Sequence, residues 1–221
     1  MTMLSINTNV GAMRSADASY SVNKSMETSM NRLSSGKRIN GAGDDAAGIQ
    51  VATRMNTEIM GLKQAVRNAA DGQAFLQTAE GALDEIHTIL LRIRELSVQA
   101  ANGTLEAADR TSLQAEVTVL ESEIDRISNN TEWGGKKIFS ATLSAGMSIQ
   151  LGVDNSQAIT VSIYQVDHSN PAEAGRNLGL NGCITTQATA RANLALVDTA
   201  ISRVSSDRGR YGATINRLDH A

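Results

Sequence analysis

The sequence has little of what usually stabilises a compact globular protein. Of its 221 residues, one is a cysteine, one is a proline and 3% are aromatic. A single cysteine excludes an internal disulfide and a thiol-rich metal site. Compact cores depend heavily on aromatic side chains, and proline punctuates loop-rich folds. The shortage of both therefore favours aliphatic rows that run along long helices.

An excess of charge of one sign is also lacking. The chain has 20 basic and 23 acidic residues, and its net charge is −3. Such a chain has no basic field to attract nucleic acid or anionic lipid, so we expect no nucleic-acid partner. Its start contains no apolar run long enough for a cleaved signal peptide, and no stretch approaches the length of a membrane span. We therefore expect no membrane insertion. A protein exported without cleavage would show the same features.

The residues that usually carry enzyme chemistry are scattered. The three histidines, His87, His168 and His220, do not have the spacing of metal ligands, and Cys183 has no histidine close to it in sequence. The adjacent carboxylates Asp44 and Asp45 would point apart on a helix, so capping is favoured over metal binding or acid–base chemistry. The sequence therefore predicts a protein that is not an enzyme and has no cofactor and no metal.

Apolar residues at helical spacing dominate the middle of the chain. One row repeats strictly every seven residues: Met55, Leu62, Ala69, Leu76, Leu83 and Leu90. This period predicts one continuous helix over about residues 46–100. At about 1.5 Å per residue it would be about 80 Å long, which is typical of a rod.

The N-terminal segment, residues 1–45, has a different character. It is rich in Ser, Thr and Asn and carries only a thin apolar stripe, which indicates a helix that is disordered or dependent on a partner. A Gly/Asn-rich link follows, and Asp44 or Asp45 can cap the next helix. Gly41 and Gly43 resemble part of a dinucleotide fingerprint. We reject that reading because no strand precedes them and carboxylates stand where a phosphate would bind.

Residues 46–221 read as one rod domain. Apolar steps of three and four predict further helices over about 105–129 and 185–221, and alternation predicts a β-hairpin over about 147–164. The fold class expected is mainly α: an elongated antiparallel helical bundle, or coiled-coil rod, with a small β-hairpin. The last apolar stripe is still running at Ala221, so we expect a truncation.

Five motifs in order carry a resemblance to a known family. They are LSINTN at 4–9, LSSGKRIN at 33–40, DDAAG at 44–48, RIRELSVQA at 92–100 and EIDRIS at 123–128. Together they resemble the bacterial flagellins closely over residues 4–137, and the match resumes over 203–218. Five ordered motifs are far more specific than any one of them.

The resemblance implies a structural subunit of the flagellar filament. Such a protein is exported unfolded and without signal cleavage, by an export apparatus and a chaperone, to the extracellular flagellum. It then assembles with other copies of itself through helical terminal segments and serves motility. By the same resemblance, this subunit lacks outer domains of any size and ends before the family's C-terminal helix. The alternatives are a hook–filament junction protein and a flagellin-like cell-surface protein that binds a polysaccharide or a metal ion.

One further property follows only from the resemblance. Flagellins of several bacterial groups are sensed by Toll-like receptor 5 through the middle of the rod. The matching positions are Arg92, Leu96 and Glu116. Leu91 departs from the family's pattern, which usually has Gln there. These three residues are the partner-binding residues that the resemblance implies.

Overall fold

A computed structural model describes residues 9–166, 178–180 and 182–220 of the chain, without the side chains of residues 141 and 142. The chain divides into two compact units, Met1–Met60 and Gly61–Ala221. Helix α2 (Ala46–Ala100) contributes residues to both units, and each part is described with its own unit. His168 and most of the motif at residues 4–9 lie outside the described residues.

The first unit contains α1 (Val10–Ser35) and the start of α2. The Asn9 side chain accepts a hydrogen bond from the backbone N–H of Ala12 at 3.1 Å, which caps the start of α1. Gly36 follows the helix with φ 65°, the left-handed conformation that glycine adopts without strain. No residue of α1 is buried. Residues 10–35 therefore form a well-bounded helix with no core of its own.

The second unit is built on the rest of α2, which carries the predicted heptad row. Leu76, Leu83 and Leu90 of that row are buried, and Met55 and Leu62 of the same row are exposed. Arg110 caps the C-terminal end of α2, because its guanidinium donates to the carbonyls of Ala100 and Asn102, each at 2.9 Å. These bonds satisfy carbonyls that the helix itself leaves without partners.

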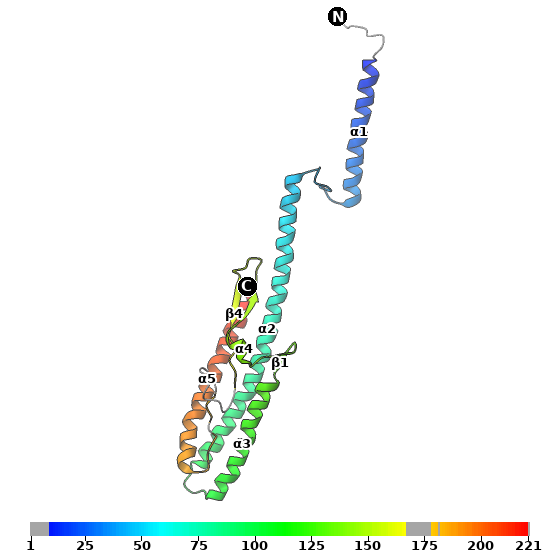
Figure 1. The fold of residues 1–221 in the computed structure, drawn as a ribbon. Coiled ribbons are helices and arrows are strands. Elements are labelled where there is room, and N and C mark those ends of the chain that lie inside the picture. Colours follow the sequence, from blue (N-terminus) through cyan, green and yellow to red (C-terminus); the bar gives the residue numbers. More distant parts are fainter. Residues whose placement is uncertain (1–8, 167–177, 181, 221) are drawn as a thin grey trace. The chain divides into compact units, whose positions relative to one another are not determined.

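Helices α3 (Ala107–Asn130) and α5 (Gln187–Asp219) both run antiparallel to α2 and lie beside it (Figure 1). Each begins with a reciprocal cap, formed by Glu106 with Asp109 and by Thr186 with Thr189. The apolar faces of all three helices meet in one core. Its fully buried large side chains are Tyr211, Leu76, Leu83, Ile86, Leu90, Ile93, Leu96, Ile124, Ile138, Ile163, Ile184 and Val117.

Two small antiparallel hairpins complete the second unit. Strands β1 (Glu132–Trp133) and β2 (Lys136–Lys137) form the first, and α4 (Ala141–Ser144) follows it. Strands β3 (Met147–Gln150) and β4 (Ala158–Val161) form the second, in which Ile149 pairs with Ile159. Ile149 packs against α2 at Gly72, where a Cβ atom would lie 2.7 Å from the Ile149 side chain. Glycine at this position lets the hairpin approach the helix closely.

The segment that leads into α5 is fastened to α3 by one side chain. The Gln114 amide donates to the carbonyl of Gly182 at 2.7 Å and accepts from the N–H of Ile184 at 2.6 Å. Leu178, Leu180 and Ile184 of this segment are buried in the core. The described residues of this segment therefore belong to the packed unit.

The predicted fold class is confirmed: the protein is mainly α with a small antiparallel hairpin. The sequence did not indicate α4 or the β1–β2 pair, which are too short to show a period. Among the described residues, no helix combines the length and hydrophobicity needed to cross a membrane.

Adjacent leucines on α2 offer a matched test of this packing. Leu90 is 0% exposed and Leu91 is 43% exposed. We expect Leu90→Ala to lower the free energy of unfolding by about 2–5 kcal/mol, because it removes buried apolar atoms and leaves a cavity. Leu91→Ala should change it by less than about 0.5 kcal/mol. Urea unfolding followed by circular dichroism measures both values, and equal losses would contradict the packing described.

Candidate interaction surfaces

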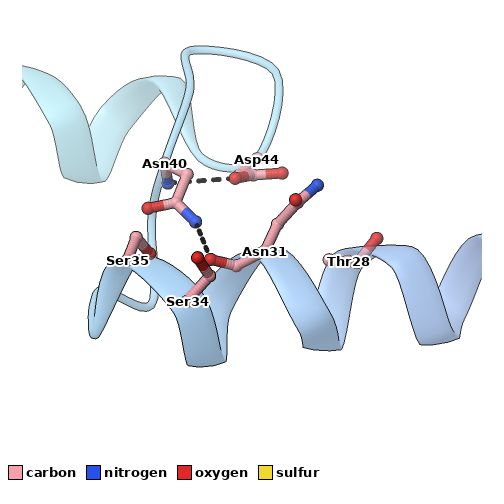
Figure 2. A pocket seen from close by; sticks show the side chains of 6 residues that line it. All are labelled: Thr28, Asn31, Ser34, Ser35, Asn40 and Asp44. Atoms are coloured by element: carbon pink, nitrogen blue, oxygen red, sulfur yellow. Dashed lines mark hydrogen bonds between the residues drawn. The ribbon is translucent and has the colours of Figure 1, made fainter.

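The link between α1 and α2 is folded by polar side chains of its own. The Asn40 amide donates to the carbonyl of Asn31 at 3.1 Å, and the Asn40 backbone N–H donates to Asp44 at 3.1 Å (Figure 2). Asp45 accepts from the N–H of Gly48 at 2.9 Å and so caps the start of α2. The hollow seen in Figure 2 is lined by Thr28, Asn31, Ser34, Ser35, Asn40 and Asp44.

These bonds show why the link does not bind a nucleotide as the motif that it resembles does. A pyrophosphate needs free backbone N–H groups at a helix start. Here the carboxylates of Asp44 and Asp45 accept from N–H groups of Asn40 and Gly48 instead. The two aspartates therefore have different structural roles: Asp45 caps the helix, and Asp44 holds the link.

The first unit exposes a large amount of apolar surface. The apolar residues of α1 that are exposed by more than half of their area are Val10, Met13, Tyr20, Val22, Met26, Met30 and Leu33. Val51, Met55, Ile59 and Met60, at the start of α2, are exposed by 43–64%. Water-soluble proteins rarely leave so long an apolar row uncovered unless it is an interaction surface. The first unit therefore presents a surface that its own residues do not cover.

The resemblance singled out Arg92 and Glu116, and the structure brings them together. Arg92 on α2 donates to the same Glu116 oxygen from Nε at 3.0 Å and from a terminal nitrogen at 2.8 Å, and it pairs with Glu95 at 3.1 Å. The hydrogen bonds to Glu116 and then Glu95 raise the pKa of Arg92 above its ordinary value. The side chains of Arg92 and Glu116 are 51% and 43% exposed. They form an accessible polar pair across α2 and α3.

Leu96, the third residue of that set, has a different position. It is 1% exposed and belongs to the core that α2 shares with α3 and α5. The apolar residues that α2 does expose in this region are Leu91 and Val98, at 43% and 50%. They are seven residues apart and therefore share one face of the helix. A partner that approaches here meets Leu91, Val98 and the Arg92–Glu116 pair, with Leu96 beneath them.

Ion pairs to α5 lie on the other flank of α2, and sequence reasoning missed them. Arg94 contacts Asp198 at 2.7 Å, and Arg208 contacts both Glu80 and Asp84 at 2.8 Å. Glu80 and Asp84 are four residues apart and so lie on one face of α2. The pairing of the two helices decides these contacts, and a single-sequence pattern does not show it.

Two further reactive side chains, Cys183 and His87, lie among the described residues. Cys183 is exposed, and its hydrogen bonds with Thr185 lower the pKa of its thiol. His87 Nδ1 is buried without a hydrogen-bond partner, at the edge of the core. Within the described parts of the chain, no three His, Cys, Asp or Glu residues gather as metal ligands would.

A groove of about 460 Å³ lies between α2 and the two hairpins. Phe75, Trp133, Met147 and Ile149 contribute much of its lining, together with polar residues such as Asp71. Trp133 is 41% exposed. The groove therefore combines apolar and aromatic side chains with polar ones.

Comparison with known proteins places this geometry in a family. The bacterial flagellin N-terminal helical region matches residues 6–144. The chain is 39% identical to flagellin of Bacillus subtilis (strain 168), over 97% of this chain and 80% of that protein. It is 44% identical to flagellin D of Vibrio anguillarum, over 78% of this chain and 45% of that protein. It also matches the crystal structure of Bacillus cereus flagellin with a TM-score of 0.59 and 33% identity, over 70% of this chain and 86% of that one.

The match to the family covers most of the chain, although the chain spans about half the length of the Vibrio relatives that it matches. The helices and motifs agree with the solved flagellin, and the family consists of structural proteins rather than enzymes. The chain belongs to the bacterial flagellin family.

Proposed function

We propose that the chain is a structural subunit of the bacterial flagellar filament and assembles with other copies of itself to serve motility. The observation that carries this proposal is the apolar row on α1, which no part of the first unit buries. An amphipathic helix of this length is marginal in water unless another helix covers its apolar face. Membership of the flagellin family favours other copies of the chain as that cover.

The same row supports export as an unfolded chain. Residues 1–45 cannot bury enough apolar area by themselves to offset the entropy lost on ordering them. In this proposal they stay unfolded through the export apparatus, with a chaperone as escort and without a cleaved signal peptide. They then fold on assembly at the extracellular flagellum. Residues 46–221 act as the preformed rod.

The proposal also specifies what covers α1. By resemblance, α1 pairs with another terminal helix in the core of the filament. Among the described residues, the β3–β4 hairpin lies between α4 and α5, and in this proposal the subunit carries no large outer domain. The relatives named above are flagellins, which favours the filament over a hook–filament junction.

Filament formation tests the role of the apolar row. Met13 and Tyr20 are seven residues apart on one face of α1, and Arg14 lies about 120° from Tyr20 around the helix. We expect Met13→Ser with Tyr20→Ser to abolish filaments, because two exposed apolar side chains about two turns apart are lost. Arg14→Ser should leave them intact, because it changes none of the exposed apolar residues. Electron microscopy is the measurement, on the chain as it stands and with the C-terminal helix of the Bacillus subtilis relative appended.

Each outcome of that experiment is informative. Filaments from the unchanged chain, or from the chain with the added helix, support the proposal. A protein that stays monomeric in both forms contradicts it. Filaments from both serine variants in equal yield would show that the apolar row on α1 is not the assembly surface.

A host receptor is a second partner that we propose for the rod, by resemblance to flagellins sensed by Toll-like receptor 5. Arg92 and Glu116 support it as an exposed, preorganised charged pair beside the apolar residue Leu91. Arginine and apolar side chains together often dominate the binding energy of protein interfaces. Leu96 would contribute by packing beneath this surface, because its side chain is buried.

Two arginines on α2, one inside and one outside the proposed receptor surface, offer a matched test of it. Arg92 pairs with α3, and Arg94 pairs with α5. We expect Arg92→Ala to weaken binding to the receptor ectodomain by about tenfold or more, and Arg94→Ala to change it by less than about threefold. Surface plasmon resonance on the monomeric chain measures both. Equal affinities of wild type and Arg92→Ala would exclude this site.

A further inference from the structure

The outer face of α3 is acidic because its contacts leave carboxylates toward solvent. The helix carries five carboxylates and two arginines. One of the arginines, Arg110, is turned to the end of α2, where it donates to two carbonyls. The other, Arg126, forms an exposed pair with Glu123 of the same helix at 2.6 Å. Three of the carboxylates follow one another at intervals of seven residues: Asp109, Glu116 and Glu123. They therefore form one acidic row along the helix.

The outer face of α5 is basic for the complementary reason. The helix carries five arginines and three aspartates. Two aspartates face α2, because Asp198 pairs with Arg94 and Asp219 accepts from Gln73 at 2.5 Å. The third, Asp207, pairs with Arg210 of the same helix at 3.3 Å, and only 16% of its side chain is exposed. On this face, three exposed arginines form a row at intervals of seven residues: Arg203, Arg210 and Arg217.

Small side chains lie beside both rows at steps of three and four residues. On α5 they are Ala192, Ala195, Thr199, Ser202, Ser206, Gly209 and Ala213, all exposed. On α3 they are Ala108, Ser112, Ala115 and Ser122, also exposed, with Val119 among them. Small residues allow two helices to approach closely, so the long side chains of the rows can reach across the contact. The small side chains alone would not identify a partner. The opposite charges of the two faces do identify one, a second copy of the chain.

We propose that the acidic face of α3 in one copy docks against the basic face of α5 in a neighbouring copy. This inference rests on the proposed self-assembly and specifies one lateral contact of it. The two rows share a spacing of about 10.5 Å between successive charges, so one alignment serves all of them. The pairs that some of these residues make within the chain, such as Glu116 with Arg92, are exposed and weak enough to rearrange.

A contact between two different faces has a consequence for the form of the assembly. Each copy that docks through its α3 face still presents its α5 face, and the reverse also holds. Such a head-to-tail contact does not saturate in a dimer and extends either into a closed ring or into an open array. An open array is what a filament subunit needs.

Charge-reversal variants test this contact directly. Variant A is Arg203→Glu with Arg217→Glu, which keeps the contact of Arg210 with Tyr164. Variant B is Glu116→Lys with Glu123→Lys, which keeps the cap formed by Asp109. In variant A both faces are acidic, and in variant B both are basic. Neither should associate with itself, yet A and B together should associate, because each then offers the face that the other lacks.

Sedimentation velocity and light scattering at low salt measure this association. We expect the self-association constants of A and of B to fall at least about tenfold below wild type, and the equimolar mixture to recover. About 1 M salt should weaken the wild type and the mixture, because it screens surface charges. The control variant, Lys136→Glu with Lys137→Glu, makes the same change in net charge as variant A, but on strand β2, and should behave as wild type. Circular dichroism verifies that all variants keep their helices.

Two results would overturn the inference: self-association of A and B equal to wild type, or folded A and B that do not associate when mixed. Failure of the proposed function would look different. If the wild type and the mixture of A and B associate but neither the chain as it stands nor the chain with the added helix forms filaments, the contact between the two faces is upheld and the filament function is contradicted.

Discussion

The structure depends on whether an apolar row along a helix is covered. In the second unit, α3 and α5 cover the row on α2, and leucines such as Leu83 and Leu90 lose all contact with water. Burying each such side chain contributes about 1.5–3 kcal/mol. In the first unit, residues of similar size, such as Met30 and Leu33 on α1, gain nothing, because they stay exposed by 63% and 82%. One chain therefore contains a unit with an apolar core and a helix without one.

This division accounts for the way polar side chains are used. In the second unit they hold together elements that are already packed: Arg110 closes the end of α2, and Gln114 fastens the segment before α5. In the first unit, the Asn9 side chain caps the start of α1 and the Asn40 side chain holds the link against α1. Caps and turns select a conformation, but they add too little stability to replace a core. In the proposed function, other copies of the chain supply the cover that α1 lacks.

Much of the fold could be predicted from the sequence, because long helices repeat a strong signal. The row from Met55 to Leu90 predicted α2, and alternation predicted the β3–β4 hairpin. Five motifs indicated the flagellin family, which the comparisons show. Short elements were missed, because α4 and the β1–β2 pair contain too few residues to display a period.

The candidate surface was harder to predict, for a physical reason. A sequence pattern shows which side of a helix is apolar, but not which neighbour each residue meets. Arg92 and Glu116 do meet across α2 and α3, whereas Leu96, taken from the same motif, is buried. The ion pairs of Arg94 and Arg208 join residues more than 100 positions apart, and only the packing of α5 on α2 brings them together.

Hydrogen exchange of the backbone amides, compared between the monomer and the assembled filament, tests the central claim most directly. The account predicts that amides of α1 exchange almost as fast as in an unfolded chain in the monomer and become protected in the filament. Amides of α2 beyond Phe75 should be protected in both states, because their helix is already covered. Strong protection of α1 in the monomer would contradict the account, since the helix would then be stable without any partner.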